Sequence, residues 1–140
     1  MTIYENDGNL DADAAQVGCY ALSSAHYNPD ITDDIFDAAW EKAKATGVLD
    51  NTDTLVDPQG FVSILGYNLK FRDGHFPADT PLDPQNMHII GKWVSGAKTH
   101  FVVMDGLGTS KDHVTYDPIK GGSLTVANGS FDSYRLFDIV

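Results

Sequence analysis

The spacing of hydrophobic residues changes near residue 66, and this change divides the chain into two halves. Before it, apolar residues recur every three or four positions among many alanines and aspartates, which is the period of helices. After it, short runs rich in valine, phenylalanine, tyrosine and threonine are separated by glycine and proline, which is typical of strands. The pattern predicts an α+β fold, with a helical N-terminal half packed on a C-terminal antiparallel β-sheet.

Three helices are predicted in the first half, at about 18–26, at about 31–45 and over the stretch DPQGFVSILG. Asp30 or Thr32 can cap the second helix, and Gly47 can end it. Asp57 can cap the third helix, because a proline follows it in the first turn.

Five strands are predicted in the second half, at about 67–72, 87–94, 100–104, 113–117 and 134–139. If the third and fourth pair symmetrically about their loop, residue 101 faces 116, and His100 faces Asp117. Directly opposite side chains share a face and lie close enough for a carboxylate to bond an imidazole. A slip of one residue would put the two on opposite faces.

Length and composition predict a single domain over residues 1–140. The chain has no apolar run long enough to cross a membrane, and its acidic start lacks the basic and apolar regions of a secretory signal. We therefore expect a protein that is cytoplasmic as made, with later release or association with a virion left open. The single cysteine excludes an internal disulfide, and we expect a monomer.

The formal net charge of −11 argues against several partners. Such a surface repels phosphate backbones and anionic lipid, so neither nucleic-acid binding nor membrane insertion is expected, and a cationic or polymeric partner suits it better. No cofactor is predicted. No metal site is predicted either, because the chain has one cysteine and its histidines are widely spaced. These histidines are His26, His75, His88, His100 and His113.

Cys19 is the candidate nucleophile, because it stands where the first helix begins. Helix N-termini favour the thiolate form, and an imidazolium nearby would favour it further. Gly18 before it leaves room for a substrate backbone. With His100 and Asp117 on paired strands, the three form a nucleophile, a base and an orienting carboxylate. Each also has an ordinary structural interpretation: a cysteine in a core, a histidine at a strand end and an Asp-Pro turn.

The stretches QVGCYALSSA, THFVVMDGL and VTYDPIKGG resemble papain-like cysteine peptidases of the C39 and C39-like group. The resemblance runs from about residue 13 to the end. It implies a papain-like fold, with Cys19 as nucleophile, His100 as general base and acid, and Asp117 as the orienting residue.

The chain departs from the family pattern around the nucleophile. The family has a glutamine six residues before the cysteine, whose amide helps to hold the oxyanion; here that position is Asp13, and Gln16 lies three residues before. The family also has a glycine after the cysteine, whereas here Gly18 precedes it. Asp13, Gln16 and Gly18 are therefore the candidate oxyanion and substrate residues.

The expected function is that of a thiol peptidase or amidohydrolase that cleaves peptide bonds, for example in bacterial peptidoglycan as a cell-wall lytic module of a phage or bacterium. Two alternatives stay open. An anionic Asp13 cannot donate to an oxyanion, which suggests a catalytically inactive C39-like domain that binds a peptide. A papain-fold acyltransferase would pass the acyl group to an amine instead of water.

Overall fold

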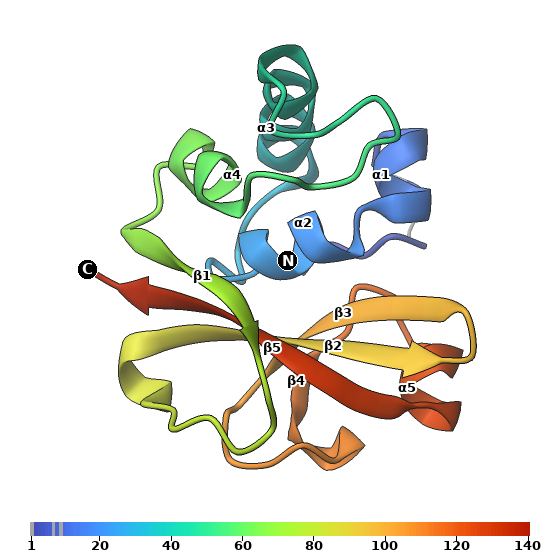
Figure 1. The fold of residues 1–140 in the computed structure, drawn as a ribbon. Coiled ribbons are helices and arrows are strands. Elements are labelled where there is room, and N and C mark those ends of the chain that lie inside the picture. The colour runs from blue at the N-terminus through green and yellow to red at the C-terminus, as the bar shows by residue number, and fades with distance from the viewer. Residues whose placement is uncertain (1, 7, 9) are drawn as a thin grey trace.

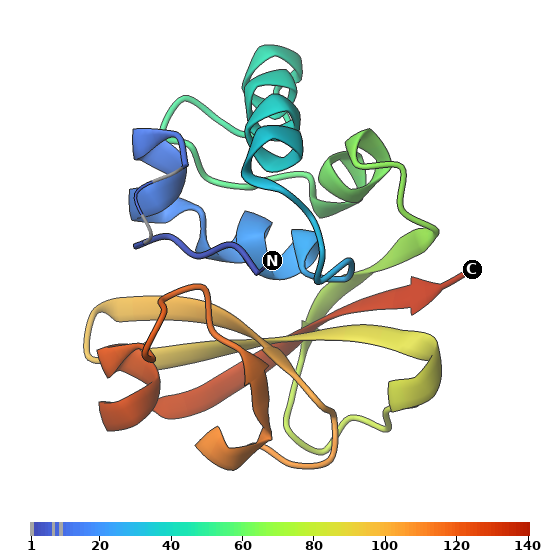
Figure 2. The ribbon, with the colours of Figure 1, turned by 180° about the vertical axis from the view of Figure 1, so that it is seen from behind.

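The helices of the N-terminal half lie on one side of a sheet. The computed structural model describes residues 2–6, 8 and 10–140, without the side chains of residues 12, 15 and 16. Figure 1 shows α1, α2, α3 and α4 above the sheet and α5 at its lower right end, and Figure 2 shows the same two layers from behind. The described residues thus confirm an α+β fold with an antiparallel sheet.

Side-chain caps begin four of the five described α-helices. Thr32 Oγ1 accepts from the N–H of Ile35, and Asp57 Oδ1 accepts from the N–H of Gly60, as the sequence indicated. Gly47 ends its helix in a left-handed conformation with φ of 78°. The helices are α1 (Ala12–Val17), α2 (Cys19–Ala25), α3 (Asp33–Thr46), α4 (Pro58–Ile64) and α5 (Leu124–Asn128). Of these, α1 and α5 were not among the three helices predicted.

The described strands form a five-stranded sheet in the order β1-β5-β2-β3-β4, with every neighbouring pair antiparallel. The strand latest in sequence therefore lies inside the sheet, between β1 and β2. The strands are β1 (Leu69–Phe76), β2 (Met87–Ser95), β3 (Lys98–Met104), β4 (Val114–Tyr116) and β5 (Ser130–Ile139).

The predicted register of the β3–β4 pair is wrong by two residues. Tyr116 pairs with Val103, not with residue 101, and a register shift follows before Met104 pairs with Val114. Extending the first pair by one residue would bring Asp117 opposite Val102 and diagonal to His100. Because side chains alternate with period two, a slip of two keeps Asp117 and His100 on one face.

Three clusters of buried side chains make up the core. One lies among the helices around Phe36, Trp40 and Phe61, and a second joins Val62 of α4 to Ile90 and Phe137 of the sheet. The third covers the other side of the sheet, where α5 packs through its buried valine. Both faces of the sheet are therefore covered, which suits strands as apolar as β2.

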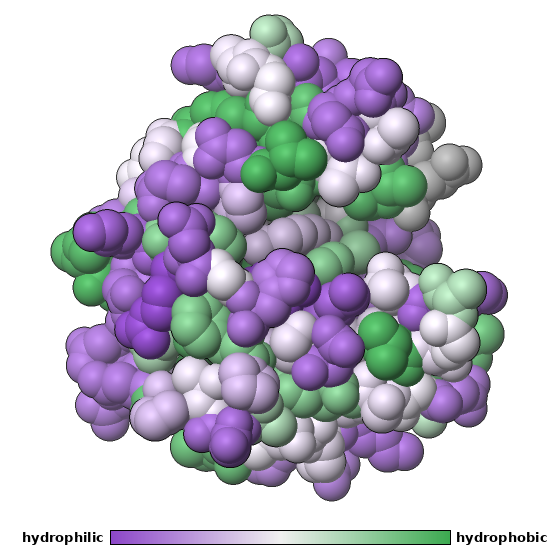
Figure 3. All heavy atoms as spheres, viewed as in Figure 1, coloured by the Kyte–Doolittle hydropathy of each residue, from purple (hydrophilic) through white to green (hydrophobic). Residues whose placement is uncertain are grey.

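The outer surface is mixed. Figure 3 shows apolar atoms among polar ones on the upper, helical part of the face that it presents. Ile35 of α3 is 55% exposed and borders a shallow hollow between α3 and α4. Within the described ranges, no helix has the length and apolar character needed to cross a membrane.

Candidate active site

Helix α2 packs along β3, and this contact brings Cys19 to the strand. Ser23 is fully buried, and its hydroxyl donates to the carbonyl of Phe101 at 3.0 Å. Tyr20 stacks on the Phe101 ring with 4.4 Å between the ring centroids. Because these two contacts anchor α2 on the middle of β3, the first residue of the helix lies beside His100, one residue before Phe101.

His100 and Asp117 are bonded to each other. His100 Nε2 lies 2.7 Å from Asp117 Oδ1, and the histidine is buried. The carboxylate is held by two further donors, since Oδ1 accepts from the N–H of Ile119 at 2.9 Å and Oδ2 from the N–H of Ser123 at 2.8 Å. A carboxylate with three donors has little freedom to turn, so it fixes the plane of the imidazole ring.

Two glycines shape the loop that supplies these donors. Gly121 and Gly122 have φ of 91° and 98°, a region that residues with a Cβ rarely enter. They reverse the chain after Asp117, so that Ser123 both donates to the carboxylate and caps α5 by accepting from the N–H of Thr125. The two glycines of VTYDPIKGG are therefore explained by this reversal.

The other side of the imidazole faces Cys19. The sulfur of Cys19, a ring nitrogen of His100 and a carboxylate oxygen of Glu5 lie within 4.8 Å of one another. Because Nε2 is bonded to Asp117, Nδ1 is the nitrogen that faces the sulfur. Burial alone would lower the pKa of His100, but hydrogen bonds to Asp117 and Cys19 and their negative charges outweigh it and raise the pKa to about 9. The imidazole is thus protonated at neutral pH.

Glu5 comes from the N-terminal segment, which is bonded to the loop after Asp117. The N–H of Glu5 donates to the carbonyl of Pro118 at 2.7 Å, and the Asn6 side chain bonds both backbone groups of Lys120. Glu5 is a buried residue, and its Oε1 has no hydrogen-bond partner among the described residues. Burial raises the pKa of Glu5 to about 7; the His100 charge opposes this rise and the Asp117 charge adds to it.

Cys19, His100 and Glu5 border a cavity of about 490 Å³. Its wall also includes the start of β3 and the residues around the beginning of α5. The remaining lining residues are Lys98, Thr99, Ile119, Gly122, Ser123, Leu124 and Thr125. The sulfur therefore opens onto a space large enough for part of a peptide.

Asp13 and Gly18, two of the three candidate oxyanion and substrate residues, are not among the described residues that line this cavity. Asp13 is exposed, and its Oδ2 lies 3.6 Å from Lys44 Nζ on α3. Gln16 belongs to α1, and its side chain lies outside the described part of the chain. The expectation that Asp13 takes the place of the family's glutamine at the oxyanion thus finds no support in its position.

The expectation that Gly18 leaves room for a substrate backbone is wrong. A Cβ at this position would collide with the carbonyl oxygen of Ala14, and the Gly18 N–H donates to that same oxygen at 2.9 Å. The space beside Gly18 is filled by the preceding helix and not left for a substrate backbone. Glycine is required here because α1 and α2 meet at this residue.

Glu5 is the residue of the site that sequence reasoning missed. The resemblance begins only after residue 13, and a glutamate in a polar stretch carries no periodic signal. The one feature that sets Glu5 apart is its place between apolar Ile3 and Tyr4 and a polar, glycine-containing turn, which is too weak to assign a role.

The arrangement combines a thiol, an imidazole oriented by a carboxylate, and an extra buried carboxylate. The first two are what acyl transfer requires. No family model matches the chain, and no curated protein or solved structure matches it significantly.

Proposed function

We propose that this chain is a cysteine peptidase, or more broadly a thiol amidohydrolase, with a papain-like fold of the C39-like kind. The observation that carries the proposal is the 2.7 Å bond between His100 and Asp117, with Cys19 against the free side of the same ring. A sulfur nucleophile, a base and an orienting carboxylate in this sequence form the arrangement used for covalent acyl transfer.

In the proposed first half-reaction, the Cys19 thiolate bonds to the carbonyl carbon of a peptide, and the carbonyl π electrons move to the oxygen. The backbone N–H of Cys19 donates to this oxyanion. The intermediate collapses, the C–N bond breaks, and the leaving amine takes the proton of His100. The result is a thioester on Cys19 and a free amine.

In the second half-reaction, water transfers a proton to His100 while its oxygen bonds to the thioester carbon. Breaking the C–S bond releases the carboxylic acid and restores the thiolate and the imidazolium. Asp117 stays ionised throughout and holds the ring in the same plane for both proton transfers.

The substrate that we propose is a peptide bond in bacterial peptidoglycan, in a stem peptide or a cross-bridge, cleaved by a lytic module of a phage or bacterium. Two features support a polymeric or cationic peptide: the net charge of −11 and the open cavity beside Cys19. The inactive binding domain stays an alternative, although Asp13 Oδ2 lies 3.6 Å from Lys44 Nζ and Asp13 does not border the cavity. The acyltransferase alternative differs only in the acceptor of the second half-reaction.

The first test is the reactivity of Cys19 with iodoacetamide, followed by mass spectrometry. At about pH 6 a free cysteine is almost entirely a thiol, whereas a thiolate paired with an imidazolium reacts promptly. We expect fast alkylation in the wild type and slow alkylation in His100→Ala. His75→Ala, at an exposed histidine of β1, is the matched control and should react like the wild type. Equal, slow rates in all three proteins would favour an inactive binding domain.

The second test is digestion of purified cell walls, with new amino groups and new carboxyl groups counted separately. We expect both to rise together for the wild type and neither to rise for Cys19→Ala. Full activity of Cys19→Ala would end the proposal. Consumption of an added amine in place of a rise in carboxyl groups would identify an acyltransferase.

A further inference from the structure

The buried Glu5 carboxylate is not used by the proposed reaction, and it needs a partner. Glu5 is 9% exposed as a residue, and its Oε1 is buried without a donor among the described residues. A buried anionic oxygen left without a hydrogen-bond donor destabilises the fold, unless a proton or a cation joins it. Glu5 points its carboxylate toward the Cys19 sulfur and the His100 ring, so whatever joins it also contacts them.

We propose that Glu5, Cys19 and His100 form a binding site for a single transition-metal dication of the zinc class. One atom from each residue lies within 4.8 Å of the other two. Ligand atoms around a tetrahedral zinc ion are separated by roughly 3.3–3.8 Å, given bonds of about 2.0–2.3 Å. Small rotations of the Cys19 and Glu5 side chains would bring the three ligand atoms from within 4.8 Å of one another to this spacing.

The types of donor atom determine which metal the site would prefer. Thiolate and imidazole favour zinc and cobalt over magnesium and calcium, which prefer oxygen ligands. A thiolate and a carboxylate together balance the charge of a dication, so the buried site would become neutral on binding. Three protein ligands with an open cavity of about 490 Å³ leave the fourth position to water, as in open zinc sites.

Asp117 supports the same interpretation. A histidine that binds a metal through one nitrogen commonly donates its other N–H to a carboxylate, which fixes the ring and makes it a better ligand. His100 is bonded to Asp117 through Nε2, and Nδ1 faces Cys19 and Glu5. Asp117 would thus hold the His100 ring for a metal on Nδ1 in the same way as it holds the ring for the proposed acyl transfer.

The effect on activity rests on the proposed function. A bound ion would occupy both the sulfur nucleophile and the nitrogen that carries the proton, so zinc would inhibit hydrolysis and a chelator would restore it. Binding itself does not depend on that function. If the chain binds zinc but does not cleave peptides, the metal site stands and the proposed function fails. If it cleaves peptides but does not bind zinc, the proposed function stands and the metal site fails.

The test is titration of the reduced full-length chain with Co²⁺ alone, followed by displacement with Zn²⁺. We expect one equivalent of Co²⁺ per chain, a near-ultraviolet charge-transfer band from thiolate to cobalt, and loss of that band with Zn²⁺ but not with Mg²⁺. Cys19→Ser should lose the band. Asp117→Asn should weaken Zn²⁺ binding by about 10–100-fold, and Glu5→Gln should weaken it by at least as much.

The matched control is Glu41→Gln, at the other glutamate of the chain, which is exposed on α3 and should bind like the wild type. Glu5→Asp is a second variant, which keeps the charge but shortens its reach, and circular dichroism checks the fold of each protein. The site is refuted if the wild type shows no charge-transfer band, or if the folded Glu5 variants bind Zn²⁺ as tightly as the wild type.

Discussion

At the scale of single residues, replacing Asp117 tests the orientation of the His100 ring without removing the Cys19 nucleophile. It accepts from His100, Ile119 and Ser123, so an amide in its place loses one acceptor and no longer favours the same imidazole orientation. Asp117→Asn is expected to lower kcat by about 10²–10⁴-fold with a smaller change in KM. Steady-state kinetics against Asp112→Asn, an exposed aspartate of the same segment, measures this. Equal kcat values in the two variants would contradict the orienting role.

His88, which is buried beneath α2, is expected to make the stability of the fold depend on pH. Its Nε2 donates to the carbonyl of Ser23 at 2.8 Å, and burial lowers its pKa to about 4, with the nearby His26 charge acting in the same direction. The folded state thus binds fewer protons than the unfolded state between about pH 4 and 6.5. Stability from this residue is complete above about pH 6.5 and is lost as the pH falls toward 4.

The variant that checks this is His88→Gln, which keeps a donor for the Ser23 carbonyl but cannot be protonated. The wild type should lose roughly 2–3 kcal/mol more than His88→Gln between about pH 7 and pH 4. Urea unfolding at both pH values measures the difference, with His75→Gln as the exposed control. Parallel pH curves for the wild type and His88→Gln would show that His88 is not held neutral.

At the scale of elements, the loop from Asp117 to Ser123 determines whether the carboxylate is held. Gly122 has φ of 98°, so Gly122→Ala strains the loop by about 1–2 kcal/mol and withdraws the Ser123 donor. Gly47→Ala adds similar strain at the end of α3, where φ is 78°. Both variants should lower the melting temperature. Only Gly122→Ala should also lower the activity measured at temperatures well below the melting temperature. Matched activity losses would mean that the loop acts through global stability alone.

The same scale shows what the sequence could and could not predict. The caps of α3 and α4 were predicted correctly, because Thr32, Asp57 and Gly47 act on the backbone within a few residues. The short α1 and α5 were missed, since six and five residues are too few for a periodic signal. Of the two-residue error in the β3–β4 register, one residue comes from the shift between Val103 and Met104, and the other is already present where Met104 pairs with Val114.

Some residues of the candidate site were predicted from the sequence and one was missed, because their contacts differ in how far apart they lie in the sequence. His100 and Asp117 lie on neighbouring strands, and a slip of two residues preserves their common face. Glu5 lies far from both in sequence and reaches them only because its segment bonds to Pro118. Contacts of that kind depend on the whole fold, and a single sequence gives no local signal for them.

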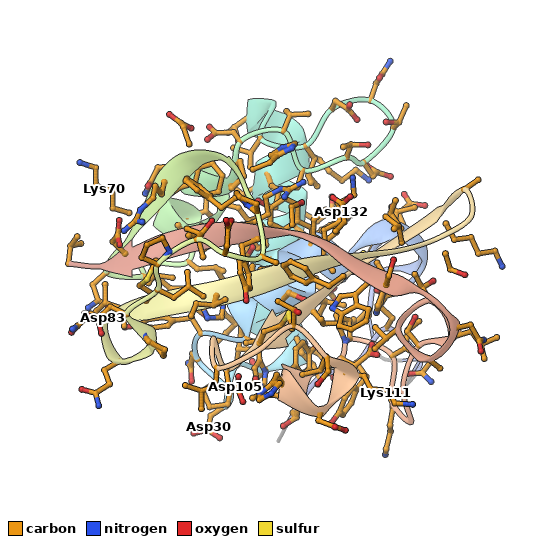
Figure 4. All side chains as sticks on the ribbon, turned by 60° about the horizontal axis from the view of Figure 1, so that its bottom comes forward. Asp30, Lys70, Asp83, Asp105, Lys111 and Asp132 are labelled. Carbon is orange, nitrogen blue, oxygen red and sulfur yellow. The ribbon has the colours of Figure 1, made fainter. Side chains whose placement is uncertain are left out.

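At the scale of the whole molecule, the charge is expected to steer substrates. Exposed acids such as Asp30 and Asp83 lie at the periphery of the molecule in Figure 4, and they contribute to the net charge of −11. For a cationic peptide, kcat/KM should fall several-fold as the salt concentration rises from about 0.01 to 0.2 M, because the Debye length shrinks below 10 Å. A neutral peptide with the same scissile bond is the control. Equal salt dependence for both peptides would exclude steering.

The place of β5 in the sheet has a consequence for synthesis on the ribosome. Cys19 is made early, but β1 and β2 do not pair with each other, and each waits for β5, which is made after every other described strand. Chains that emerge from the ribosome before residue 130 cannot close the sheet that supports His100. We therefore expect the nascent chain to lack a complete candidate site until β5 has left the ribosome, so that the proposed activity would appear only after residues 130–139 are made.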